Sequence, residues 1–241
     1  MWETGICALH TLHKPHGRKS ADAEKDAFYL AHAAQGRRRQ SRPARGEMRR
    51  PRIKNGIVAE YNPFHTGHAY QIARTRELLG PDCAVAAVMS GSWVQGGRPA
   101  MLDKWTRAKL ALLGGVDLVL ELPTVWAASS AETFARGAVD LLALTRSVDV
   151  LSFGSECGDV EALSQIACCL NTPGYEALVR RYVFQKLPFA AARQRAVEEL
   201  LGTERAALLS TPNNNLGVEY LRNLERDGWA MGAVTVRREG A

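Results

Sequence analysis

The sequence predicts an α/β protein built on a doubly wound parallel sheet. From residue 53 onward, short apolar runs alternate with segments of helical periodicity. The apolar runs lack the regular polar positions of a half-exposed strand, which is typical of strands covered by helices on both faces. Polar residues also follow each of the first four runs. Right-handed crossovers between such strands give a Rossmann-like layered arrangement.

The expected strands are buried runs that end at breaker or polar residues. The clearest run is Cys-Ala-Val-Ala-Ala-Val-Met at residues 83–89, and Pro123 stops the run that ends at Glu121. The predicted strands are residues 53–59, 83–89, 116–121, 148–153 and 233–238. The predicted helices are residues 69–79, 104–113, 127–144 and 216–226, and residues 158–209 have a mostly helical, polar-faced pattern.

Polar motifs lie at the carboxyl ends of the predicted strands. In open α/β sheets, ligands bind at these ends, close to the point where the strand order reverses. The residues that follow the first four strands are His65 and His68, Ser90 and Gly91, Glu121, and the segment Gly154-Ser155-Glu156. The sequence therefore predicts a ligand site along this edge of the sheet.

The first fifty residues differ from the rest of the chain in charge. Up to Arg52 there are twelve Lys and Arg against five Asp and Glu, whereas the remainder is close to neutral. This extension could be a basic tail that touches RNA or a targeting peptide, but we favour a mis-assigned start, with Met48 close to the true one. We expect disorder over residues 1–50 in every case, and a single α/β domain over residues 51–241.

Several classes of protein are excluded by missing signals. No run of eighteen apolar residues exists and the first thirty residues lack a signal-peptide core, so we expect a cytoplasmic protein without a membrane span. The five cysteines form no CxxC pair, and no histidine lies at metal-ligand spacing from them, so no protein-built metal site is expected. Neither a GxxxxGK[ST] loop nor a GxGxxG turn is present.

The junction after the first strand carries the strongest chemical signal. The strand leads into an Asn62-Pro63 turn, then into His65-Thr66-Gly67-His68, and a helical pattern follows. A helix N-terminus offers free N–H groups and partial positive charge, which suit phosphate. Two imidazoles fixed there could stabilise the charge that develops on an α-phosphate during nucleotidyl transfer. The alternatives are that these histidines only cap the helix, fill the core, or begin a metal site whose third ligand is not evident.

These residues form part of an ordered set of motifs by which the chain resembles the tRNA(Met) cytidine acetate ligases, a family within the HxGH nucleotidyltransferase superfamily. The set covers about four-fifths of the chain. It comprises Val-Ala-Glu-Tyr-Asn-Pro-Phe-His-Thr-Gly-His at 58–68, Val-Met-Ser-Gly at 88–91, Lys-Trp at 104–105, Glu-Leu-Pro at 121–123, Ser-Ala-Glu-Thr-Phe-Ala at 130–135, Phe-Gly-Ser-Glu at 153–156 and Thr-Pro-Asn-Asn at 211–214.

The resemblance implies an ATP-dependent ligase. Acetate and ATP would give acetyl-adenylate and pyrophosphate, with Mg2+ bridging the phosphates. The acetyl group would then pass to N4 of the wobble cytidine of elongator tRNA(Met), with release of AMP. Two alternatives remain: an adenylyltransferase that acts on a small phosphorylated acceptor, and a non-catalytic ATP- or RNA-binding fragment. No pattern in the sequence predicts an oligomeric state.

The resemblance also implies the site residues. His65 and His68 would steady the phosphates during catalysis, and Gly154, Asn213 and Arg238 would touch ATP. The nucleotide-binding segment would be Val58, Ala59, Glu60, Tyr61, Asn62, Pro63, Phe64, His65, Thr66, Gly67, His68, Ala69, Tyr70 and Gln71. From the residues alone, Gly154 could equally be a turn glycine, Asn213 a helix cap, and Arg238 a solvated charge.

Other charged residues have weaker assignments. Lys104 and Arg107 lie one turn apart on a predicted helix, where we favour a solvated face over contact with phosphate or tRNA. Glu121 could position magnesium or a ribose. Arg98 is displaced by two positions from the family's Gln-Arg-Gly motif, which leaves its role open. Family members continue past this chain's last residue into a helical region that helps hold tRNA, so we expect a chain truncated before that region.

Overall fold

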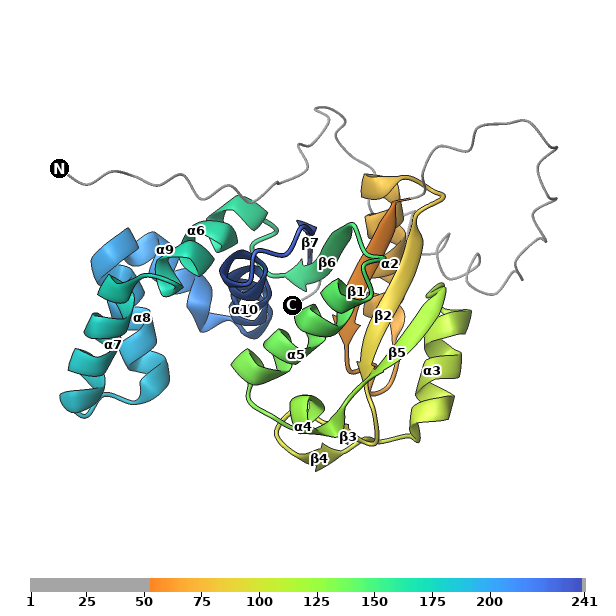
Figure 1. The fold of residues 1–241 in the computed structure, drawn as a ribbon, viewed down its shortest axis with the longest axis horizontal. Helices are drawn as coiled ribbons and strands as arrows, with labels where there is room; N and C mark the ends of the chain where they lie inside the picture. The colour runs from red at the N-terminus through yellow and green to blue at the C-terminus, as the bar shows by residue number, and fades with distance from the viewer. Residues whose placement is uncertain (1–52, 240–241) are drawn as a thin grey trace.

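The five strands of the main sheet run parallel in the order β5-β2-β1-β6-β7 (Figure 1). The structure is a computed structural model that describes residues 53–239. Our interpretation of residues 1–50 as a disordered, mis-assigned extension lies outside this range. The strands are β1 (Lys54–Ala59), β2 (Ala84–Ser90), β5 (Leu118–Leu122), β6 (Val150–Ser155) and β7 (Gly232–Arg237).

This strand order confirms the predicted doubly wound sheet. The chain moves from β1 outward through β2 to β5 and then returns to place β6 on the other side of β1. The order therefore reverses between β1 and β6, so a crevice for a ligand is expected outside their carboxyl ends. A two-stranded hairpin that was not predicted, β3 (Trp93–Val94) with β4 (Arg98–Pro99), follows β2.

Helices fill the connections, and three predicted boundaries were wrong. The first helix begins at Thr66 rather than at residue 69. The helix predicted over residues 127–144 is broken, because the Ser129 hydroxyl donates to the Trp126 carbonyl at 2.6 Å and Ser130 has extended dihedrals. The last helix begins at Pro212 rather than at residue 216. The helices are α2 (Thr66–Leu79), α3 (Lys104–Leu113), α4 (Thr124–Ala127), α5 (Ala131–Leu144), α6 (Val160–Leu170), α7 (Pro173–Phe184), α8 (Phe189–Leu201), α9 (Thr203–Ala207) and α10 (Pro212–Arg226), with a 3-10 turn η1 (Leu208–Ser210).

Two apolar clusters lie on opposite faces of the sheet. On one face, Ile57, Val85 and Met89 pack with residues of α2 and α3. On the other, Val88 and Phe153 pack with residues of α5, α6 and α10, and this larger cluster extends into α7, α8 and α9. Figure 1 shows α5 and α10 on one side of the sheet and α2 on the other. Successive residues of a strand therefore point to opposite faces of the sheet and pack against different helices.

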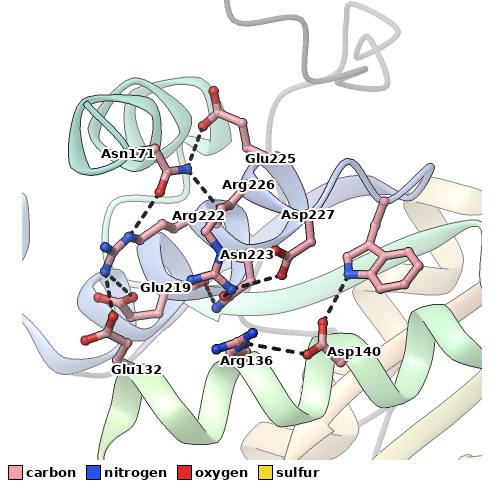
Figure 2. A network of polar contacts seen from close by, with 11 residues as sticks. Glu132, Arg136, Asp140, Asn171, Glu219, Arg222, Asn223, Glu225, Arg226 and Asp227 are labelled. Atoms are coloured by element: carbon pink, nitrogen blue, oxygen red, sulfur yellow. Dashed lines mark hydrogen bonds and ion pairs between the residues drawn. The ribbon is translucent and has the colours of Figure 1, made fainter. Parts of the chain in front are cut away.

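Helix α10 is held to its neighbours by a polar network (Figure 2). Arg222 pairs with Glu132 of α5 at 2.9 Å and donates to Asn171, which follows α6, at 3.2 Å. Beyond the end of the helix, the Trp229 indole donates to Asp140 of α5 at 3.1 Å. These contacts fix the helix whose N-terminus lies beside the end of β6.

Arg107 of α3 is completely buried, so the predicted solvated position was wrong. Its guanidinium donates to the carbonyl of Glu60 at 2.6 Å, to that of Ser90 at 2.9 Å, and also to that of Gly91. These carbonyls lie just past β1 and at the end of β2, where sheet pairing stops. One side chain therefore satisfies the backbone of both strand ends and holds them together.

We predict that Arg107→Met lowers the free energy of unfolding by at least about 3 kcal/mol, because each buried acceptor left unpaired costs roughly 1–3 kcal/mol. Equilibrium urea unfolding would measure this. Lys109→Met on the exposed side of the same helix is the control, with a change within about 0.5 kcal/mol. Equal midpoints for Arg107→Met and wild type would contradict the role given to this guanidinium.

A second prediction concerns packing between α10 and the sheet. A Cβ at Gly217 would lie 2.5 Å from Cε2 of Phe153, whereas a Cβ at Gly174 in α7 would meet nothing within 4 Å. Gly217→Ala should destabilise the protein by about 1–3 kcal/mol through overpacking. Gly174→Ala should stabilise it by up to about 1 kcal/mol. Thermal unfolding of both variants tests the pair, and shifts of the same sign would disprove the packing argument.

Candidate nucleotide-binding site

The turn between β1 and α2 is anchored by aromatic side chains. Tyr61 is 1% exposed and adopts a positive φ of 46°, just before a cis Asn62-Pro63 bond. The Phe64 ring lies 5.0 Å from the Tyr61 ring and packs so closely on Gly114 that a Cβ there would overlap it. Asn62 accepts a hydrogen bond from the Met101 amide at 2.7 Å. This turn therefore sets where the following helix begins.

His65 and His68 cap α2 with one nitrogen each. The Gly67 amide donates to Nδ1 of His65 at 3.1 Å, and the His65 amide donates to Nδ1 of His68 at 3.2 Å. Because Nδ1 is the acceptor in both rings, a neutral imidazole here carries its hydrogen on Nε2. The capping alternative is thus correct, yet it leaves one N–H donor on each ring available to a ligand.

The two rings stack, with centroids 3.7 Å apart and 29° between their planes. Burial, together with smaller effects of the nearby charges of His65 and Arg238, lowers the pKa of His68 to about 3. His68 is therefore neutral at physiological pH and acts as a fixed hydrogen-bond donor. The surroundings of His68 disfavour the positively charged imidazolium form of its ring.

The ends of β6 and β7 bring together the other three predicted residues. The Arg238 guanidinium donates to Oδ1 of Asn213 at 3.3 Å, and the Arg238 amide continues the sheet by donating to Ser155. Gly154 lies beside them: its φ is not positive, and an added Cβ would come only within 3.6 Å of Arg238. Its protein neighbours therefore do not require a glycine here.

Glu156 orients Asn213, a role that the sequence did not reveal. Its carboxylate accepts from the side chain of Asn213 at 2.7 Å and from the amide of Asn214 at 2.8 Å. Burial alone would raise the pKa of Glu156, but these hydrogen bonds outweigh it and leave the pKa lowered. The carboxylate after β6 thus caps the N-terminus of α10. Its place directly after a strand end was the available signal.

The two halves of the site meet across the point where the strand order reverses. Arg238 is close enough to His68 to lower its pKa. The Tyr70 hydroxyl donates to Glu239 at 2.6 Å, and Gln71 of α2 donates to the Ser152 carbonyl of β6 at 3.4 Å. The structure therefore gathers His65, His68, Gly154, Asn213 and Arg238 along one edge of the sheet.

Other predicted residues lie elsewhere. Tyr61 belongs to the core, so its side chain supports the turn. Lys104 and Glu121, which were candidates for contacts with phosphate or magnesium, form an ion pair with each other at 2.7 Å. Arg98 lies on β4 and is exposed. Within residues 53–239, no group of three or more His, Cys, Asp or Glu residues could hold a metal ion, and no helix is long and apolar enough to cross a membrane.

Comparison with known proteins finds relatives of this chain. Curated relatives named tRNA(Met) cytidine acetate ligase include one from Thermoanaerobacter sp. (strain X514), 44% identical over 77% of this chain and 47% of the relative. Another, from Syntrophotalea carbinolica, is 48% identical over 77% of this chain and 45% of the relative. The solved structure of Thermotoga maritima TmcAL bound with alpha-thio ATP is 39% identical, with a TM-score of 0.75 over 78% of this chain and 47% of that one.

The chain spans about half the length of the curated relatives it matches. The family model described as HIGH Nucleotidyl Transferase matches residues 54–241, which include the whole sheet and every residue gathered at the site. The match begins at the first residue of β1 and contains both histidines of the turn. This chain therefore belongs to the HIGH nucleotidyl transferase family.

Proposed function

We propose that this chain binds ATP at the β1–α2 junction and activates acetate as acetyl-adenylate. The observation that carries the proposal is the pair of stacked imidazoles at the N-terminus of α2, each of which accepts a backbone N–H at Nδ1 and so leaves Nε2 to face a ligand. Residues 58–71 would cradle the phosphates, and Gly154, Asn213 and Arg238 would contact the rest of the nucleotide. Residues 51–241 form the domain proposed to carry this step.

The chemistry assigned to these residues is charge stabilisation without proton transfer. An acetate oxygen attacks the α-phosphorus, the bond to pyrophosphate breaks, and negative charge accumulates on the phosphate oxygens. Fixed donors at a helix end stabilise that charge with little reorganisation. Mg2+, where bound by the phosphates, would neutralise part of their charge, and the protein supplies no ligand cluster for it among its described residues.

The second step proposed is transfer of the acetyl group to N4 of a tRNA cytidine, with elongator tRNA(Met) as the acceptor and the cytoplasm as the compartment. The names of the curated relatives support this acceptor, and the ATP analogue in the solved TmcAL structure supports the nucleotide. Because the chain covers only about half of those relatives, the two steps need separate assays.

His68→Ala should reduce acetate-dependent exchange of pyrophosphate into ATP by at least about 100-fold, as expected for loss of one fixed donor to a developing oxyanion. Arg74→Ala, farther along α2, is the control and should exchange at the wild-type rate. A normal rate in His68→Ala would rule out the phosphate role of that ring. Exchange in wild type that needs a phosphorylated acceptor instead of acetate would favour the adenylyltransferase alternative.

The lowered pKa of His68 also predicts a pH dependence of stability. The ring is protonated below about pH 6.5 in the unfolded chain but only near pH 3 in the folded protein. Unfolding therefore takes up a proton between these values, so the contribution to stability is complete above pH 6.5 and is lost as the pH falls toward 3. Urea unfolding of wild type and His68→Gln from pH 7 to pH 4 should show a smaller loss in the variant. Parallel losses would show that the ring titrates normally.

A further inference from the structure

Glu60 and Ser90 lie side by side at the carboxyl ends of β1 and β2. The register pairs Val58 with Val88 and Ala59 with Met89, so Glu60 and Ser90 come next. Arg107 bonds the carbonyls of both residues, which confirms that they are neighbours. By strand alternation they share the face of Val58 and Val88, which pack in the cluster formed with α5 and α10.

Gln95, from the β3–β4 hairpin, joins this pair. The backbone N–H of Gln95 donates to Oε1 of Glu60 at 2.8 Å. The backbone N–H of the next residue, Gly96, donates to the carbonyl of Ser129, just before α5. Glu60, Ser90 and Gln95, called here the Glu60 cluster, thus lie on the α5 and α10 face. The negative charge of Glu60 also adds to the effect of burial in raising the pKa of Tyr220 of α10.

The Glu60 cluster holds polar atoms that the protein leaves unpaired. Ser90 is 0% exposed, and its hydroxyl has no hydrogen-bond partner. The Nε2 amide of Gln95 is likewise buried without one. Buried polar groups are nearly always hydrogen-bonded, because leaving one unpaired is unfavourable. Two such groups, on the residue next to Glu60 in the sheet and on the residue whose backbone amide bonds Glu60, point to a ligand that pairs with them.

The chemistry of the cluster selects among the substrates of the proposed reaction. The Glu60 carboxylate accepts hydrogen bonds and repels a second carboxylate, which disfavours acetate. The guanidinium of the nearby Arg107 directs its N–H donors to backbone carbonyls, so it is not aimed at a ligand anion. The Nε2 group of Gln95 donates, and a serine hydroxyl can do either. The matching partner is neutral, with an amino group next to an acceptor, as on the pairing edge of cytosine.

We propose that the Glu60 cluster binds the acceptor cytosine, with Glu60 accepting from its N4 amino group and Gln95 donating to its N3 or O2. This inference rests on the proposed function and adds the residues that read the base. N4 attacks the acetyl carbonyl carbon, the bond from that carbon to the AMP oxygen breaks, and AMP leaves. The proton lost from N4 passes to the Glu60 carboxylate and then to solvent. Glutamate is a recognised partner for cytosine N4 in base readout.

The test is base preference in the full chain, measured by equilibrium dialysis with labelled cytidine and uridine. Wild type should prefer cytidine by about tenfold, since a good bidentate contact discriminates at that level. In Glu60→Gln, the oxygen of the new side-chain amide can still accept from the backbone N–H of Gln95. The NH2 group of that new amide then faces the base. This group opposes the N4 amine but matches O4 of uridine, so the preference should reverse. Glu161→Gln, on the exposed first turn of α6, should keep the wild-type preference.

Ser90→Ala provides a variant that does not depend on a change of charge. Because the hydroxyl is unpaired in the free protein, its removal should not lower the unfolding midpoint. Cytidine affinity should nevertheless fall about three- to tenfold, as expected for one hydrogen bond. A lower midpoint with unchanged cytidine affinity would show that Ser90 is structural and would overturn its assignment.

Two further outcomes separate this inference from the proposed function. Equal binding of cytidine and uridine by wild type, or an unchanged preference in Glu60→Gln, would overturn the inference even where acetate-dependent exchange is normal. A reversed preference in Glu60→Gln, together with no acetate-dependent exchange in wild type, would support the base site and overturn the proposed adenylate chemistry.

Discussion

The buried guanidinium of Arg107 is the constraint on which the rest of the site depends. At the end of a parallel strand, the last carbonyls extend beyond the hydrogen-bonded ladder. At a ligand-binding edge of the sheet, no further strand is available to bond them. Here one side chain from α3 satisfies the carbonyls at the ends of β1 and β2 and so holds these ends together. The β1–α2 turn and the Glu60 cluster both start from these residues. A charged residue is used because no neutral side chain offers as many donors in one plane.

The reversal of strand order places two chemically different regions on one edge of the sheet. On the α2 side, the histidines offer donors suited to phosphate, and Arg238, which bonds Asn213 of α10, adds positive charge where the two sides meet. On the α5 and α10 side, the end of β1 presents the Glu60 carboxylate. An anionic nucleotide and a neutral, amine-bearing base would therefore bind on opposite sides of the same strand end. Such a separation suits a reaction in which an acyl group moves from a phosphate to an amine.

The fold could be predicted from the sequence because it depends on periodicity. Unbroken apolar runs such as residues 83–89 indicate strands buried on both faces, and their alternation with helices leaves few topologies. The position of the histidines was also predictable, since a turn and a helix start are local features. The break at Ser129 was not, because a hydroxyl that bonds its own backbone competes with the helix only in a particular geometry. The burial of Arg107 and the contact of Glu156 with Asn213 depend on residues distant in the sequence.

The hydrogen-bonding of the two imidazoles has a further chemical consequence. A neutral histidine binds zinc, copper or nickel through its single basic lone pair, and in both rings that lone pair is already taken by a backbone N–H. Paired, stacked histidines at a surface turn would otherwise be an attractive chelate for such ions. The capping that starts α2 therefore leaves neither of these two rings a free lone pair with which to bind such an ion.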